Sequence, residues 1–124
     1  MLNGIHHVSI NVKDVDESIK FYVDLLGMEQ IPRPDLGFPG AWLKSAGQEV
    51  HLLGIDSTPP PKEQHFAFAV EDLPGVINTV EEAGFKCSTA SEIDGVCLQS
   101  FTHDPSGNMV EFNQRLQVVT SSSV

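Results

Sequence analysis

Two stretches of the chain alternate apolar residues with small or polar ones in the same way. The first is HVSINVKD, from His7 to Asp14, and the second is HFAFAVED, from His65 to Asp72. Each begins with His, has Val at its sixth position and ends with a charged residue followed by Asp. Alternation of this kind predicts a half-buried strand, and the closing Asp is a favoured helix N-cap. Each stretch is therefore predicted to be a strand that leads into a helix.

The chain after each Asp has apolar residues at the spacing of an amphipathic helix. The first run ends at Gly27, and the second, which has Pro74 in its first turn, ends at Gly84. Pro is tolerated in the first turn of a helix, and Gly is favoured just past its end. The apolar positions are Ile19, Tyr22, Val23 and Leu26 in the first run and Val76, Ile77, Val80 and Ala83 in the second. We therefore predict one helix after each strand.

Short apolar or β-branched runs follow each helix and predict further strands. They lie at 30–33, 41–44 and 50–54, and then at 86–89, 97–101 and 109–113. Between the two sets, DSTPPPKEQ carries three prolines, which cannot join a sheet ladder. The chain is thus predicted to be one α+β domain, residues 1–124, built from two βαβββ modules. Module one is at about 4–55, the linker at about 56–63, module two at about 64–115 and a frayed tail at 116–124.

Strand parity gives each first strand two different faces. His7 and His65 each share a face with small or polar residues, while bulky Val, Ile or Phe residues stand on the opposite face. The bulky face is expected to pack against the helix and to leave the His face as an open cup. His6 is then placed on the face opposite His7.

The closing strands of the two modules repeat a second pattern. GQEVHLL at 47–53 and GNMVEFN at 107–113 place His51 and Glu111 at the same point. Each module therefore offers one metal-binding side chain on its first strand and one on its last. If equivalent modules pack about a pseudo-twofold axis, these four side chains meet. The predicted metal ligands are His7, His51, His65 and Glu111.

The charge of the chain limits its partners. Seven Lys and Arg against seventeen Asp and Glu give a formal net charge of −10, which repels phosphate backbones and anionic lipid surfaces. We therefore expect no nucleic-acid or membrane partner. The opening MLNGIHHVSI has no secretory-signal pattern, so a cytoplasmic location is expected. Cys87 and Cys97 are expected to be reduced, although a disulfide between them is the alternative.

Three separated motifs in this chain resemble a known family. HHVSINVKDVDESIKFYVDLLGM, HFAFAVEDL and FTHDPSGNMVEF are similar to motifs of the vicinal oxygen chelate superfamily, which includes glyoxalase I, bleomycin resistance proteins and extradiol dioxygenases. The chain looks most like the glyoxalase-I-like branch. This resemblance implies two βαβββ modules that form an open, cupped β-barrel around one divalent metal ion, and a homodimer. It places the ligands at His7, His51, His65 and Glu111, with His51 where glyoxalase I has Glu.

The ligand set and the resemblance together predict the chemistry. Three imidazoles and one carboxylate suit Zn, Ni, Co, Fe or Mn, and such an ion stabilises an enolate on a substrate with two neighbouring oxygens. Glu111 is the candidate catalytic base. We therefore predict a metal-dependent, glyoxalase-I-like lyase or isomerase that acts on a small molecule. The alternatives are a metal-free binding protein of the bleomycin-resistance kind and an extradiol-type dioxygenase.

Four more side chains are candidate substrate contacts. They are Arg33, Trp42, Phe101 and His103. Arg33 lies in a stiff IPRPD segment and is able to hold a carboxylate, with a solvated loop position as the alternative. For the two aromatic residues the alternative is core packing, and for His103 it is a place in the turn before the last strand.

Overall fold

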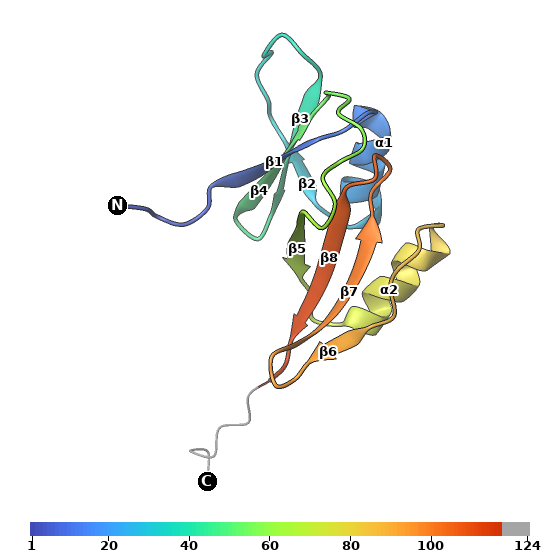
Figure 1. The fold of residues 1–124 in the computed structure, drawn as a ribbon. Coiled ribbons are helices and arrows are strands. Elements are labelled where there is room, and N and C mark those ends of the chain that lie inside the picture. Colours follow the sequence, from blue (N-terminus) through green and yellow to red (C-terminus); the bar gives the residue numbers. More distant parts are fainter. Residues whose placement is uncertain (118–124) are drawn as a thin grey trace. The chain divides into compact units, whose positions relative to one another are not determined.

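The computed structural model describes residues 1–117, and Figure 1 follows the elements along the chain. Most of the predicted tail, residues 118–124, lies outside the described residues. The chain divides into two compact units. The first unit is Met1–Lys62 together with Asp104–Asn108, and the second unit is Glu63–His103 together with the described residues from Met109 onward.

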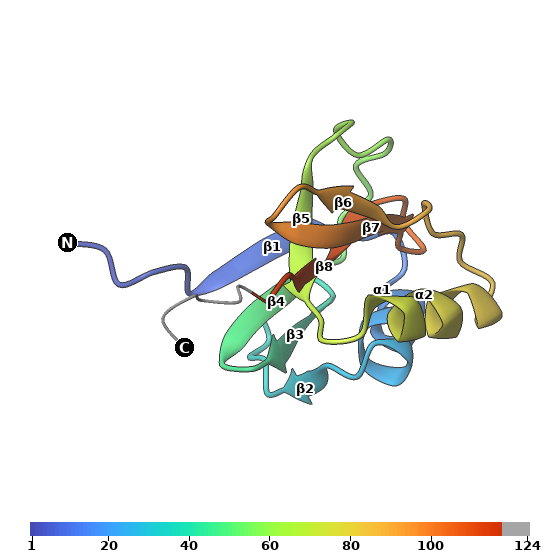
Figure 2. The ribbon, with the colours of Figure 1, turned by 90° about the horizontal axis from the view of Figure 1, so that it is seen from below.

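The first unit contains a four-stranded mixed sheet with the strand order β1-β4-β3-β2. Its elements are β1 (His7–Asn11), α1 (Val15–Ile19), the π-helical turn η1 (Lys20–Leu25), β2 (Glu29–Ile31), β3 (Gly40–Ser45) and β4 (Gln48–Leu53). Strand β1 runs parallel to β4, whereas β3 runs antiparallel to both β4 and β2. Figure 2 shows β4, β3 and β2 side by side.

The second unit repeats this plan with the strand order β5-β8-β7-β6. Its elements are β5 (His65–Ala69), α2 (Leu73–Glu82), β6 (Ser91–Ile93), β7 (Cys97–His103) and β8 (Met109–Arg115). Strand β5 is parallel to β8, and β7 is antiparallel to both β8 and β6. The predicted α+β class and the repeated βαβββ order are confirmed.

Both helices begin where the sequence predicts, and α2 also ends just before the predicted Gly84, whereas α1 ends at Ile19 and continues as η1 to Leu25. Asp14 caps α1 by accepting a hydrogen bond from the backbone N–H of Glu17, and Asp72 caps α2 by accepting one from Gly75. Gly27 and Gly84 follow the helices with φ of +84° and +95°, a left-handed conformation that Gly adopts without steric cost. The η1 turn, in which the N–H of Leu26 bonds to the carbonyl of Phe21, was not predicted.

Within each unit, apolar side chains of the helix pack against the sheet. Helix α1 contacts β3 and β4, and helix α2 contacts β7 and β8. The fully buried side chains include Phe21, Tyr22, Leu43 and Leu52 in the first unit and Leu73, Val80, Val110 and Phe112 in the second. In β1 and β5 the Val, Ile or Phe positions are more buried than the His positions, as strand parity predicts. None of the helices among residues 1–117 is long and apolar enough to cross a membrane.

The predicted strand at residues 86–89 is wrong. The strand β6 lies further on, at Ser91–Ile93. Residues 86–89 run alongside β7 but form no regular ladder with it. One backbone hydrogen bond, from the N–H of Ser88 to the carbonyl of Phe101, joins this segment to β7. The other bonds come from side chains, because Ser100 Oγ donates to the carbonyl of Ser88 and Thr102 Oγ1 donates to the carbonyl of Lys86. The hydroxyl of Ser88 in turn accepts from the backbone N–H of Phe101. Hydroxyl side chains compete in this way with regular sheet pairing.

Candidate functional site

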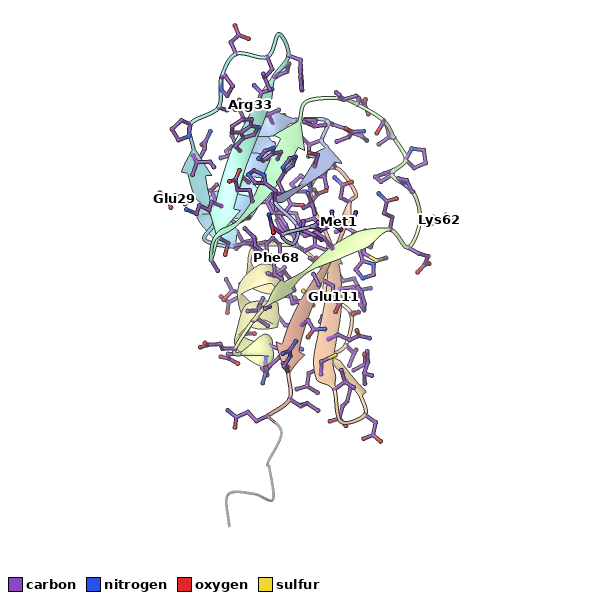
Figure 3. All side chains as sticks on the ribbon, turned by 90° about the vertical axis from the view of Figure 1, so that its left-hand side faces the viewer. Met1, Glu29, Arg33, Lys62, Phe68 and Glu111 are labelled. Atoms are coloured by element: carbon purple, nitrogen blue, oxygen red, sulfur yellow. The ribbon has the colours of Figure 1, made fainter. Side chains whose placement is uncertain are left out.

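The second unit brings two predicted ligands together. In the parallel pair of β5 and β8, His65 stands opposite Met109 and Ala67 stands opposite Glu111. The two side chains lean toward each other across this offset, so that His65 Nε2 lies 2.9 Å from Glu111 Oε1. Figure 3 labels Glu111, which extends from β8. An imidazole nitrogen and a carboxylate oxygen at this separation can bind the same small cation.

Hydrogen bonds fix both members of this pair. Glu111 is 7% exposed, and its second oxygen accepts a hydrogen bond from Asn113 Nδ2 at 2.8 Å. His65 Nδ1 lies 2.8 Å from the carbonyl oxygen of Glu63. That carbonyl raises the pKa of His65, the Glu111 carboxylate adds to the effect, and partial burial opposes it. The imidazole and the carboxylate are therefore oriented before any ligand arrives.

The first unit places three rings in one stack. The His51 ring lies between the His7 ring, with centroids 4.0 Å apart, and the Trp42 ring, with centroids 4.5 Å apart. The interplanar angles are 13° and 12°, so the three rings are nearly parallel. They come from the neighbouring strands β1, β4 and β3. The stack brings His7 and His51 together on one face of the sheet.

Glu49 is a partner of this stack that the sequence analysis missed. Its Oε1 lies 2.8 Å from His51 Nε2, and the hydrogen bond from His51 lowers the pKa of Glu49. Because Glu49 and His51 are two residues apart on β4, strand parity puts them on the same face and would have found the pair. The same spacing relates Glu111 and Asn113 on β8.

His6 lies against His7 rather than away from it. Its Nδ1 is 2.9 Å from His7 Nδ1, and the two rings meet edge to face with centroids 5.1 Å apart. The parity argument fails for His6 because this residue precedes β1, which begins at His7. Outside the regular strand, alternation no longer determines the direction of a side chain.

Two of the predicted substrate contacts touch a predicted ligand. Trp42 stacks on His51, and Phe101 meets the His65 ring edge to face with centroids 5.3 Å apart. Trp42 stands opposite His51 in the strand register, as Phe101 does with Glu111. The two units therefore each place one aromatic side chain beside the predicted ligand on their closing strand.

The other two predicted substrate contacts lie elsewhere. His103 is exposed and is the last residue of β7, so the expected place in the following turn is wrong by one residue, because the ladder continues to the pair with Met109. Arg33 follows β2, donates from Nη2 to the carbonyl of Phe38 at 3.0 Å, and has its guanidinium carbon 4.9 Å from the centre of the Phe38 ring.

The donor chemistry fits a divalent metal ion, but neither unit forms a complete site by itself. Within the first unit, and likewise within the second, no three His, Cys, Asp or Glu side chains of residues 1–117 gather closely enough to hold an ion. Each unit supplies a pair of predicted ligands instead: His7 with His51, and His65 with Glu111. A four-ligand site thus remains a prediction that needs both pairs.

Comparison with known proteins identifies close relatives over most of the chain. "Glyoxylase I 4" of Arabidopsis thaliana is 38% identical over 121 residues, covering 89% of this chain and 70% of the relative. A trivalent organoarsenical cleaving enzyme of a Bacillus species is 32% identical, covering 86% of this chain and 70% of the relative.

A solved structure supports the same relationship. The crystal structure of a glyoxalase family protein from Bacillus anthracis is 27% identical and has a TM-score of 0.83, covering 94% of this chain and 98% of that one. The family model of the Glyoxalase/Bleomycin resistance protein/Dioxygenase superfamily matches residues 4–112. The resemblance seen in the sequence motifs is confirmed, and the chain belongs to this superfamily.

Proposed function

We propose that the chain is a divalent-metal-dependent enzyme of the glyoxalase-I-like kind, a lyase or isomerase that acts on a small substrate with two neighbouring oxygens. The observation that carries this proposal is the pair of His65 and Glu111, whose nitrogen and oxygen lie 2.9 Å apart on neighbouring strands. The pair of His7 and His51 supplies the remaining two ligands. The Arabidopsis and Bacillus anthracis relatives, both described as glyoxalases, support the enzyme class.

Each residue of the proposed site has a distinct proposed role. A bound divalent ion would polarise the substrate oxygens as a Lewis acid. Glu111 is the proposed proton acceptor, because it is the one carboxylate in the ligand set, and Asn113 holds its second oxygen at 2.8 Å. Trp42 and Phe101 are proposed to supply apolar surface next to the ligands. With His51 in the set, this chain has a single metal-binding carboxylate.

Metal analysis of the purified protein tests this proposal first. We expect one divalent ion per chain, a loss of at least tenfold in metal affinity in His65→Ala and in Glu111→Gln, and an unchanged metal content in the control His103→Ala. Metal bound equally well by His65→Ala would contradict the ligand set. The metal-loaded protein is then assayed for turnover and for solvent deuterium exchange with hemithioacetals, 2-oxo acids and acyl thioesters. A trivalent organoarsenical belongs in this panel because a relative cleaves that class of compound.

One observation favours a second function, that of a metal-free binding protein of the bleomycin-resistance kind. All four proposed ligands already have protein partners, since His65 bonds to Glu111, His51 bonds to Glu49 and His7 bonds to His6. Buried polar groups satisfied in this way do not require an ion. A protein that contains no metal after purification, takes up none on dialysis and shows no deuterium exchange would contradict the metal-dependent enzyme and favour this second function.

A further inference from the structure

The first unit contains a cavity, largely open to solvent, whose lining carries two cations and two carboxylates. The cavity has a volume of about 580 Å³ and lies where β1 and β4 end and β3 begins. Its lining includes Lys13, Asp14, Asp16, Arg33, Gly40 and Gly54. None of the predicted metal ligands lines it. A volume of this size suits a small organic molecule.

The guanidinium of Arg33, which lines this cavity, does not use all of its hydrogen-bond donors. Its Nη2 donates to the carbonyl of Phe38, its guanidinium lies over the Phe38 ring, and its buried Nε has no hydrogen-bond partner among the described residues. A guanidinium carries five N–H donors, and a buried donor without a partner is costly. Because Nε is buried, an acceptor in the cavity reaches it only if the guanidinium shifts. The Nε–H group of Arg33 is thus a hydrogen-bond donor without an acceptor among the described residues.

Gly40 makes room for the guanidinium. A Cβ atom at this position would lie 2.5 Å from the carbonyl oxygen of Leu52 and 2.9 Å from both Cζ and Nη2 of Arg33. Any residue other than Gly would therefore push the guanidinium out of its place against β3. Figure 3 labels Arg33 near the loop that joins β2 to β3. Gly40 is thus required by the close approach of the β4 backbone as well as by the guanidinium.

The cation pair belongs to the first unit alone. A second cavity, of about 640 Å³, lies at the matching end of β5 and β8. The second residue after the first strand is Glu71 there, where the first unit has Lys13. Arg115 lines this second cavity without a lysine beside it. The chain has only seven Lys and Arg at a formal net charge of −10, and two of the seven line the first cavity. The pair is therefore not a by-product of the repeated fold.

We propose that this cavity binds the carboxylate group of a small monoanionic organic acid. Arg33 donates two parallel hydrogen bonds to the carboxylate oxygens, and Lys13 supplies the second positive charge. Asp14 and Asp16 also line the cavity and repel a second negative charge on the ligand, which favours a carboxylate over a phosphate dianion. Asp14 is already engaged as the cap of α1. This inference concerns the first unit and does not depend on the proposed metal site.

Titration of ¹⁵N-labelled protein with sodium acetate, at an ionic strength held constant with sodium chloride, tests the proposal. We expect saturable shifts in the backbone amides of Lys13, Gly40 and Gly54 and in the Arg33 Nε–H resonance. Arg33→Gln weakens acetate binding by about tenfold or more, as expected for loss of a charged hydrogen-bond donor. Lys13→Gln weakens it by a smaller factor, and Arg33→Lys keeps the charge without restoring the paired donors.

Arg115→Gln is the matched control, because it removes the same charge from an exposed residue that lines the second cavity. It is expected to bind acetate as the wild-type protein does, and the dispersion of the amide spectrum reports whether each variant is folded. The proposal is overturned if acetate causes no saturable shift, or if Arg33→Gln and Lys13→Gln both bind acetate with wild-type affinity. Inorganic phosphate that binds more tightly than acetate overturns the ligand class.

Discussion

Tyr22 and Asp104 form a buried hydrogen-bonded pair within the first unit. The Tyr22 hydroxyl donates to Asp104 Oδ2 at 2.8 Å, and both side chains are almost fully withdrawn from solvent, at 0% and 4% exposure. Asp104 Oδ1 accepts from the backbone N–H groups of Ser106 and Asn108. Burial, together with the negative charge of Asp104, raises the pKa of Tyr22 well above its ordinary value.

The titration of Tyr22 can be observed alone, because the chain has one Tyr. We expect no tyrosinate absorbance near the usual pKa of about 10 while the protein is folded. The folded pKa lies above the unfolded one, so the stability that the neutral phenol contributes is complete below about pH 10 and declines as the pH rises further. Absorbance and circular dichroism, recorded together over an alkaline pH series, measure the ionisation of Tyr22 and the loss of folded protein.

Tyr22→Phe is the control for this titration. It removes the absorbance change and flattens the loss of stability above about pH 10, since no phenol remains to ionise. A reversible tyrosinate signal near the ordinary pKa, with the circular dichroism unchanged, would show that Tyr22 is exposed to solvent and would contradict the buried pair.

At the residue scale, local pattern predicts some partners and not others. The partnership of Glu49 with His51 follows from strand parity, because the two side chains are two residues apart on β4. The partnership of Tyr22 with Asp104 spans 82 positions, and no periodicity links them. The segment Asp104–Asn108 joins β7 to β8 yet packs within the first unit, which the division into two modules gave no reason to expect. Contacts of this kind depend on tertiary structure.

At the scale of elements, the helix starts were the clearest signal in the sequence. Asp14 and Asp72 each follow a strand by three residues, and each accepts a hydrogen bond from the backbone N–H three residues further on. The strand at residues 86–89 was predicted wrongly because β-branched and apolar composition does not distinguish a ladder from bonds made by Ser100 and Thr102 side chains. A helix cap depends on residues that are close in sequence. Sheet pairing depends on a partner strand, which the local sequence does not identify.

The cap of α2 gives a prediction about two residues that act together. Asp72→Ala is expected to cost about 1 kcal/mol of stability through loss of the cap. Gly75→Ala would raise helix propensity by about 1 kcal/mol. However, a Cβ at Gly75 would overlap the carboxylate of Asp72 and disturb the cap. The single Gly75→Ala change is therefore expected to be close to neutral.

A double-mutant cycle in urea separates these effects. In the Asp72→Ala background the collision is absent, so Gly75→Ala is expected to stabilise the protein by about 1 kcal/mol. The midpoint of unfolding shifts while the denaturant slope stays constant. If the two changes are strictly additive, the cap and the added methyl group do not interfere and the expectation fails.

At the scale of the whole molecule, the internal repeat carried most of the information. It predicted two βαβββ modules, and it assigned one ligand to the first strand and one to the last strand of each module. The structure pairs His7 with His51 and His65 with Glu111 inside their own units. Repetition could not predict the differences between the units, such as Glu49 in the first and Met109 in the matching register position of the second.

The proposed site uses ligands from both units, so metal binding should couple them. At a free metal concentration of one hundred times Kd, a site present only in the folded state adds about 2.7 kcal/mol to the free energy of unfolding. We expect this gain to disappear equally in His7→Ala, from the first unit, and in His65→Ala, from the second. Thermal unfolding with and without the ion measures it, with His103→Ala as the control that keeps the gain.

The same measurement distinguishes a site within one chain from a site shared in a homodimer. A site within one chain gives a gain that is independent of protein concentration, whereas a site completed by a second copy gives a gain that grows with protein concentration, because folding and association are then linked. Light scattering during size-exclusion chromatography shows which species is present. If His65→Ala abolishes the gain and His7→Ala leaves it intact, the ion binds to the second unit alone, and the four-ligand site is wrong even though the pair of His65 and Glu111 binds metal.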